Sequence, residues 1–169
     1  MLNFHIAFIT YYRILDEKFL RREILTGPGE GKIPLNAKIK LCSRNKCVSI
    51  ECDVYLHVKG YSLARVTHVD IEEKILNEIV KPKKSQYCFY KVNDDSVCIY
   101  LRNPIYSKSL NILVRRIIIE SKELAEALGE STRSWVFVGG KYGGIFLGFK
   151  KEQMEKLEQL ARKYGVSPR

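Results

Sequence analysis

Residues 134–149 read SWVFVGGKYGGIFLGF, two apolar runs on either side of four glycines that enclose a lysine and a tyrosine. A Walker-type phosphate loop requires a Ser or Thr after its lysine, but Tyr142 follows Lys141. The glycine offsets of a dinucleotide-binding loop do not match either. Aromatic and β-branched residues favour strands, and paired glycines permit the positive φ angles of a tight connection. The stretch therefore predicts a β-hairpin that is apolar on both faces, which suits either a central position in a sheet or a hairpin covered by a partner.

Outward from this hairpin, the pattern predicts further strands and helices. Runs of β-branched and aromatic residues between turn residues indicate strands, and apolar residues at helical spacing between capping residues indicate helices. We expect strands at 3–12, 37–59 (a hairpin with a long second arm), 63–69, 86–92, 96–102 and 110–120, and helices at 13–25, 70–81, 121–130 and 150–165. This order predicts an α+β fold: a mainly antiparallel sheet built from β-hairpins, with three to four helices packed against one side.

The length of 169 residues fits one domain or two small ones. We place a boundary near residue 69, between an N-terminal region (1–69) of strand, helix and hairpin and a C-terminal domain (70–169) of helix, hairpin, strand, helix, hairpin and helix. The alternative is one continuous domain. The apolar N-terminal stretch is too short to span a bilayer and has no basic residue before it, so we expect a cytoplasmic protein without a membrane partner.

The charge balance is the strongest indication of function. Twenty-nine Lys and Arg against nineteen Asp and Glu leave a formal charge of +10 and a pI near 9.4. An excess of this size favours an anionic partner, nucleic acid first. No helix-turn-helix or zinc-finger pattern is visible, which favours RNA over duplex DNA. Scarce glutamine beside abundant Lys, Arg, Glu and Ile also resembles the composition of heat-adapted proteins.

Candidate binding residues are basic clusters that lie beside aromatic or apolar strands. The KPKK run precedes the aromatic strand QYCFY, and an arginine pair interrupts the apolar run ILVRRIII. Adjacent strand residues point to opposite faces, so at least one arginine must leave the core, toward a polyanion or on a charged edge strand. The hairpin tip adds a lysine next to a tyrosine. The predicted nucleic-acid-binding residues are Lys81, Lys83, Lys84, Arg115, Arg116, Arg133, Lys141 and Tyr142.

The cysteine spacing raises the question of a zinc site. Cys42, Cys47, Cys52 and His57 follow one another at intervals of five residues, which alternate between faces along a strand. None of the C-x2-C knuckles of structural zinc sites is present, so we expect no metal. Cys42 and Cys47 flank the turn SRNK, where they either form a cross-strand disulfide or remain free thiols.

The sequence offers no recognisable catalytic motif, and we assign no catalytic residue and no cofactor. Asp94 and Asp95 belong to the turn VNDDSV, whose chemistry explains them. Asp53, Asp70, Asp94 and Glu120 could converge in three dimensions into a metal site, but the sequence gives no reason to select them. Two alternatives to a nucleic-acid-binding protein remain: a metal-dependent nuclease, and an interaction or assembly subunit, homodimers included, that uses the apolar hairpin 134–149.

Overall fold

The computed structural model describes most of the chain. The described residues are 2–9, 32–35, 37–50, 52–57, 71–129, 133–140, 144–148 and 151–164. The helix expected at 13–25 and the strand expected at 63–69 lie outside them. So do Asp70, Lys141 and Tyr142.

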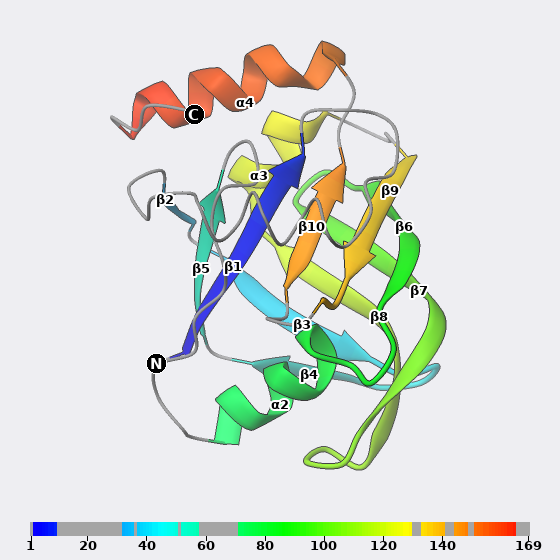
Figure 1. Ribbon diagram of the computed structural model, residues 1–169. Helices are drawn as coiled ribbons and strands as arrows, with labels where there is room; N and C mark the ends of the chain where they lie inside the picture. The colour runs from blue at the N-terminus through cyan, green and yellow to red at the C-terminus, as the bar shows by residue number, and fades with distance from the viewer. Residues whose placement is uncertain are drawn as a thin grey trace.

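The described residues form one sheet of ten strands, in the order β2-β5-β1-β10-β9-β6-β7-β8-β3-β4 (Figure 1). The strands are β1 (Leu2–Ile9), β2 (Lys32–Leu35), β3 (Lys38–Cys42), β4 (Cys47–Ile50), β5 (Cys52–His57), β6 (Gln86–Val92), β7 (Ser96–Ser107), β8 (Ile112–Glu120), β9 (Arg133–Val138) and β10 (Ile145–Gly148). All the described pairings are antiparallel except the two of β1, which lies parallel to β5 and to β10. The mainly antiparallel sheet is confirmed.

Hairpins between chain neighbours build much of this sheet: β3 with β4, β6 with β7, β7 with β8, and β9 with β10. The predicted hairpin at 134–149 corresponds to β9 and β10, in which Ile145 lies opposite Val138. It has β6 on one side and β1 on the other, so its predicted central position is confirmed.

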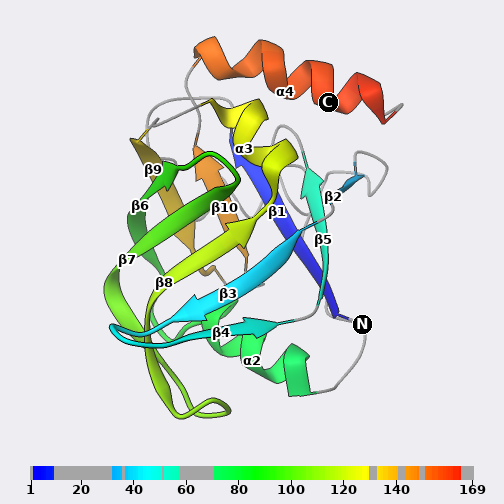
Figure 2. The ribbon, with the colours of Figure 1, turned by 180° about the vertical axis from the view of Figure 1, so that it is seen from behind.

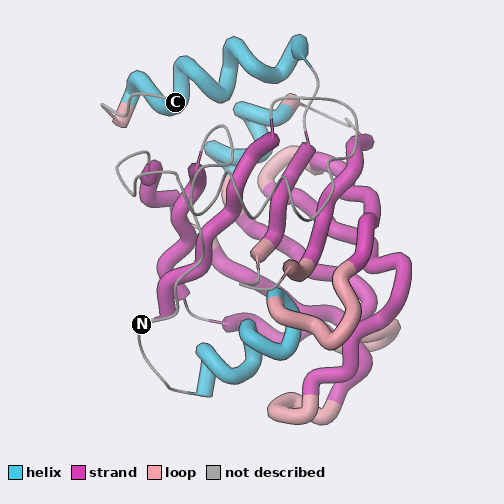
Figure 3. Tube along the Cα trace, viewed as in Figure 1, coloured by secondary structure: helices cyan, strands magenta, loops and turns pink. Residues whose placement is uncertain are grey.

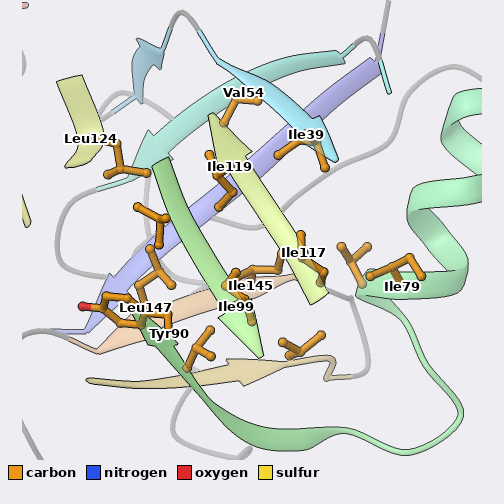
Figure 4. Close-up of a cluster of buried hydrophobic side chains, with 14 of the residues drawn as sticks. Ile39, Val54, Ile79, Tyr90, Ile99, Ile117, Ile119, Leu124, Ile145 and Leu147 are labelled. Atoms are coloured by element: carbon orange, nitrogen blue, oxygen red, sulfur yellow. The ribbon is translucent and has the colours of Figure 1, made fainter. Parts of the chain in front are cut away.

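The sheet curls strongly, so that one of its faces surrounds the core. In Figure 1, β5, β1, β10 and β9 run steeply on the near side while β7, β8 and β3 cross behind them, and in Figure 2 the latter three lie in front. Figure 4 shows aliphatic side chains from these strands meeting in the enclosed space, among them Ile39, Val54 and Ile145. These side chains are almost completely buried. We call this concave side the inner face of the sheet and the convex side the outer face.

Three helices in the described residues close two ends of the curled sheet (Figure 1). They are α2 (Ile71–Val80) at one end, and α3 (Lys122–Leu128) and α4 (Lys151–Lys163) at the other. Each adds buried residues to the core that the inner face encloses, for example Ile79, Leu124 and Leu157. The expected α+β fold is thus only partly confirmed, because the helices are few and lie at two ends instead of forming a layer on one side.

The ends of α3 follow the predicted capping chemistry. Ser121 accepts a hydrogen bond from the backbone N–H of Leu124 through its side chain, at 3.1 Å. Gly129 has a φ of 87°, and its N–H donates to the Ala125 carbonyl. The helix expected at 121–130 is therefore confirmed, with its ends at Lys122 and Leu128.

The predicted hairpin at 37–59 is correct for β3 and β4, but its single long second arm is wrong. β4 pairs with β3 at one edge of the sheet, whereas β5 pairs with β1 and β2 near the other edge. The curl brings these two edges together, since β3 and β5 are in contact. Residues close in sequence can therefore belong to opposite edges, and the sheet combines strands from before and after residue 69.

An irregularity in β7 explains the paired arginines. The register of β7 against β8 shifts between Tyr100 and Ile105, opposite residues 114–116 of β8. Val114 and Ile117 are both buried although they are three residues apart, so strict alternation is interrupted and Arg115 and Arg116 are both only partly buried. The Gln86 side chain holds the shifted segment by donating to the Asn103 carbonyl and accepting from the Asn103 N–H, each at 2.8 Å.

Tyr90 supports a first prediction, because its buried hydroxyl donates to the Gly148 carbonyl at 2.6 Å. Burial raises the pKa of this hydroxyl, which therefore stays protonated. We expect Tyr90→Phe to lower the free energy of unfolding by about 1–2 kcal/mol in urea titrations, because a buried carbonyl loses its donor. The matched control is Tyr106→Phe, which removes an exposed bond to Asn111 and should change stability by less than about 0.5 kcal/mol. Equal losses in both variants would contradict the assignment.

Candidate nucleic-acid interface

Two exposed aromatic side chains lie side by side on the outer face of the sheet. In β6 the side chains of Cys88, Tyr90 and Val92 point inward, so Phe89 between them points outward. Phe89 lies directly opposite Tyr100 of β7, and the two residues are 42% and 46% exposed. Large aromatic side chains are usually buried, so two exposed ones next to each other indicate a candidate binding surface.

Basic side chains surround this aromatic pair. The Arg133 guanidinium lies 4.8 Å from the centre of the Phe89 ring, and Lys91 lies opposite Arg133 in the pairing of β6 with β9. On the other side, Arg116 of β8 lies directly opposite Tyr100. We call Phe89, Lys91, Tyr100, Arg116 and Arg133 the outer-face cluster. Figure 2 turns the outer face of β7 and β8 toward the reader.

Cys98 lies beneath this cluster and connects two of its members. Burial raises the pKa of its thiol, although Tyr100 and the Arg116 guanidinium act to lower it. The hydrogen bond with Cys98 is also the main reason that the pKa of Tyr100 is raised. Both groups therefore stay protonated near neutral pH.

The positive charge of the cluster is not neutralised within the described part of the chain. There, the salt bridges are Lys40 with Glu120 and Lys163 with Glu123. None of the three cations of the outer-face cluster forms a salt bridge with a described carboxylate. Unpaired cations on one convex surface produce a positive field that attracts anions.

A disulfide extends this basic surface. Cys42 of β3 lies opposite Arg116 on one side and is bonded to Cys47 of β4 on the other, which decides the question that the sequence left open. The turn between the two cysteines exposes Arg44 and Lys46. A row of directly paired residues thus crosses five strands, from Cys47 and Cys42 through Arg116 and Tyr100 to Phe89.

A second basic group lies at the other end of β6, in the loop between α2 and β6. Lys81, Lys83 and Lys84 are exposed in this loop, which we call the basic loop (81–85). It contacts the glycine connection of the central hairpin, because the Gly140 N–H donates to the Ser85 hydroxyl at 2.7 Å. Figure 3 shows this loop, in pink, close to the ends of β9 and β10.

Backbone N–H groups of the glycine connection donate hydrogen bonds within the chain. Gly139 donates to the Gly144 carbonyl at 3.0 Å, and Gly144 donates to the Val80 carbonyl at 2.9 Å. Together with the bond from Gly140 to Ser85, three glycine N–H groups are satisfied within the chain. A phosphate cradle needs free backbone N–H groups. These three amides therefore serve a turn between two strands.

The structure brings the predicted binding residues together in two places. Arg116 and Arg133 flank the exposed aromatic pair, whereas the three lysines of the basic loop lie at the far end of β6. Arg115 lies beside Arg116 where the register of β8 changes. Lys141 and Tyr142 lie outside the described residues.

Phe89, Lys91 and Tyr100 were not predicted as site residues. The alternation of β6 in sequence puts Tyr87, Phe89 and Lys91 on one face and Cys88 and Tyr90 on the other. Both faces of this pattern are rich in aromatic residues, so hydrophobicity does not identify the outer one. Lys91, at the end of the first series, is the residue that could have identified the outer face.

The alternative functions find little support among the described residues. No group of three or more His, Cys, Asp and Glu side chains within them could hold a metal ion. The sulfurs of Cys42 and Cys47 are bonded to each other and not available to zinc. The described side chains of β9 and β10 from Trp135 to Leu147 are buried within the chain and present no open apolar surface.

Among the residues that the structure describes, no helix is long and apolar enough to cross a membrane.

The fold and the outer face define a sheet-rich, mainly antiparallel protein with a basic, aromatic surface. Comparisons with models of protein families, with curated proteins and with solved structures find no match to this chain.

Proposed function

We propose that the protein binds nucleic acid, RNA or DNA, in the cytoplasm through the outer face of its sheet. The observation that carries this proposal is the outer-face cluster, where cations without described carboxylate partners surround two exposed aromatic rings. Phosphates attract the cations, and the rings offer surfaces to bases. The net charge of +10 supports the same partner.

The basic loop gives this surface a second set of phosphate contacts. Six residues of extended chain separate Ser85 from Lys91, which corresponds to roughly 20 Å. A polyanion that follows β6 would meet the basic loop at one end and the outer-face cluster at the other. Such binding is driven by the release of counterions and falls steeply with salt.

The test is fluorescence anisotropy with labelled RNA and DNA across a salt series. We expect log affinity to fall linearly with log salt. Replacing Lys91, Arg116 and Arg133 together with glutamine should reduce the slope by about 2, at about 0.7 per phosphate contact, and weaken binding at low salt at least about tenfold. The control replaces Lys74, Lys156 and Arg162, exposed on α2 and α4, which changes the net charge equally.

Two results would contradict the proposal. The first is an absence of binding even at low salt. The second is an equal loss of affinity in the site and control variants, which would show that binding depends on the net charge and not on the outer-face cluster. The binding reactions are also incubated with magnesium and run on a denaturing gel. Metal-dependent cleavage of the labelled strand would favour the nuclease alternative.

A further inference from the structure

We propose that the outer-face cluster selects single-stranded nucleic acid, stacking unpaired bases on Phe89 and Tyr100 while Arg116 and Arg133 contact the flanking phosphates. This inference rests on the proposed function and adds to it the class of nucleic acid and the residues that discriminate. Three observations carry it: the pairing of the two rings, the arginine beside each of them, and the burial of their aromatic neighbours.

The two rings occupy directly opposed positions on neighbouring strands. Residues so paired in an antiparallel sheet have β-carbons about 4.5–5.5 Å apart. Figure 2 shows the curl of the strands, and the outer face is its convex side. Side chains on neighbouring strands therefore diverge as they leave this face. Two adjacent, diverging rings can receive two successive bases of a flexible strand.

Each ring has a guanidinium beside it. Arg133 lies over Phe89 with 4.8 Å between its Cζ atom and the ring centre, and Arg116 faces Tyr100 across the β7–β8 pairing. A guanidinium can stack on a base and also donate two hydrogen bonds to a phosphate. The pair of arginines therefore suits a ligand whose planar groups alternate with anions along one chain.

The stacking surface ends where the neighbouring aromatic residues begin. Trp135 lies opposite Phe89 on the same face but is only 7% exposed, and Phe137 is buried next to it. Tyr87 contacts both of these rings, with centroid distances of 6.4 Å and 4.9 Å. The described aromatic residues of β9 thus pack against Tyr87 of β6 and Phe146 of β10, which leaves an exposed surface two rings wide.

Single strands fit this surface better than duplexes for a geometric reason. In a duplex the faces of the bases are stacked on one another, and only their edges are open in the grooves. Entry into the major groove requires an element as narrow as a helix or a two-stranded ribbon. Phe89 and Tyr100 lie within a broad sheet, with β9 on one side and β8 and β3 on the other. Only unpaired bases can reach the rings.

The experiment compares three labelled ligands of equal length: a single strand, the same strand paired with its complement, and an abasic strand that keeps the phosphates but has no bases. We expect the single strand to bind more tightly than the abasic strand, by about 5-fold to 150-fold for each stacked base. Phe89→Ala and Tyr100→Ala should each weaken binding of the single strand by that factor and leave the abasic strand unaffected. Tyr106→Ala is the control, because Tyr106 is 55% exposed on β7 beyond the register shift.

A second readout does not depend on affinity. Tyr100→Trp places an indole at the proposed stacking position, and we expect its fluorescence to be quenched by the single strand but not by the abasic strand. The native Trp135 is buried, so the unsubstituted protein gives the background signal. Phe89 and Tyr100 are both about half exposed, so we expect each variant to retain the fold, and circular dichroism checks this.

The possible outcomes separate this inference from the proposed function. Equal binding of the single and abasic strands, with no effect of Phe89→Ala or Tyr100→Ala, would overturn base stacking and leave phosphate binding intact. Preference for the duplex would overturn the choice of a single strand. If none of the three ligands binds at low salt, the proposed function itself fails, and this inference fails with it.

Discussion

Replacing Gly148 with alanine should lower the free energy of unfolding by about 3 kcal/mol or more. A β-carbon at Gly148 would lie 2.1 Å from Cε2 of Trp135 and 2.5 Å from two further atoms of the indole. Trp135 is 7% exposed and packs edge-on against Tyr87, so the ring cannot move aside without opening this aromatic group. The Gly148 carbonyl also accepts the Tyr90 hydrogen bond, which any shift of the strand would strain.

The test is a double-mutant cycle in urea. In a Trp135→Phe background the smaller ring leaves room for the new methyl group, so Gly148→Ala should cost at least about 1 kcal/mol less than in the native chain. Additive effects would show that the destabilisation has another cause. The same comparison bears on the candidate site, because Trp135 lies opposite Phe89.

Gln86→Glu should destabilise the protein by about 2–4 kcal/mol at neutral pH. The Gln86 amide donates to the Asn103 carbonyl and accepts from the Asn103 N–H, and Gln86 is buried. A carboxylate at this position could still accept from the Asn103 N–H. Its second oxygen would replace the amide NH2 group, however, so a buried negative charge would face the Asn103 carbonyl oxygen without a donor between them. Gln159→Glu on the exposed surface of α4 is the matched control and should change stability by less than about 0.5 kcal/mol.

The sign of the pH dependence tests the mechanism of this loss. A protonated carboxyl group can both donate and accept, as the amide does. The destabilisation by Gln86→Glu should therefore shrink as the pH falls toward about 4, where carboxyl groups become protonated, when measured against the native protein at the same pH. A loss that does not change with pH would indicate a packing defect.

Local sequence signals predicted individual elements well. Ser121 and Gly129 mark the two ends of α3. The Ser121 hydroxyl accepts a hydrogen bond from a backbone N–H at one end, and the positive φ of Gly129 lets its N–H reach a carbonyl at the other, so groups that the helix leaves unpaired are satisfied. The strands on either side of residues 93–95, and those on either side of the glycine-rich stretch, pair antiparallel as expected. These signals act over a few residues, so no knowledge of the rest of the chain is needed to interpret them.

The candidate site was only partly predictable. Arg116 and Arg133 stood out as charges within or beside apolar strands, and the structure brings both to the exposed aromatic pair. Phe89 and Tyr100 did not stand out, because an aromatic residue in a strand is expected in the core. Their exposure depends on which face of β6 and β7 the curl encloses, and that is decided by strands far away in the sequence.

Sequence patterns alone specified the hairpins, the α3 caps, the central apolar character of residues 134–149 and the excess of positive charge, since each depends on neighbouring residues or on composition. The tertiary structure decided the order of the strands, with β1 parallel between β5 and β10, β4 at one edge and β5 next to the other edge. It also decided the register shift that brings Arg115 and Arg116 out of the core together, and which side of the sheet became the outer face. The physical reason is that burial is a property of the whole sheet. When both faces of a strand are apolar, distant strands decide which face is buried, because they close around only one of the two faces.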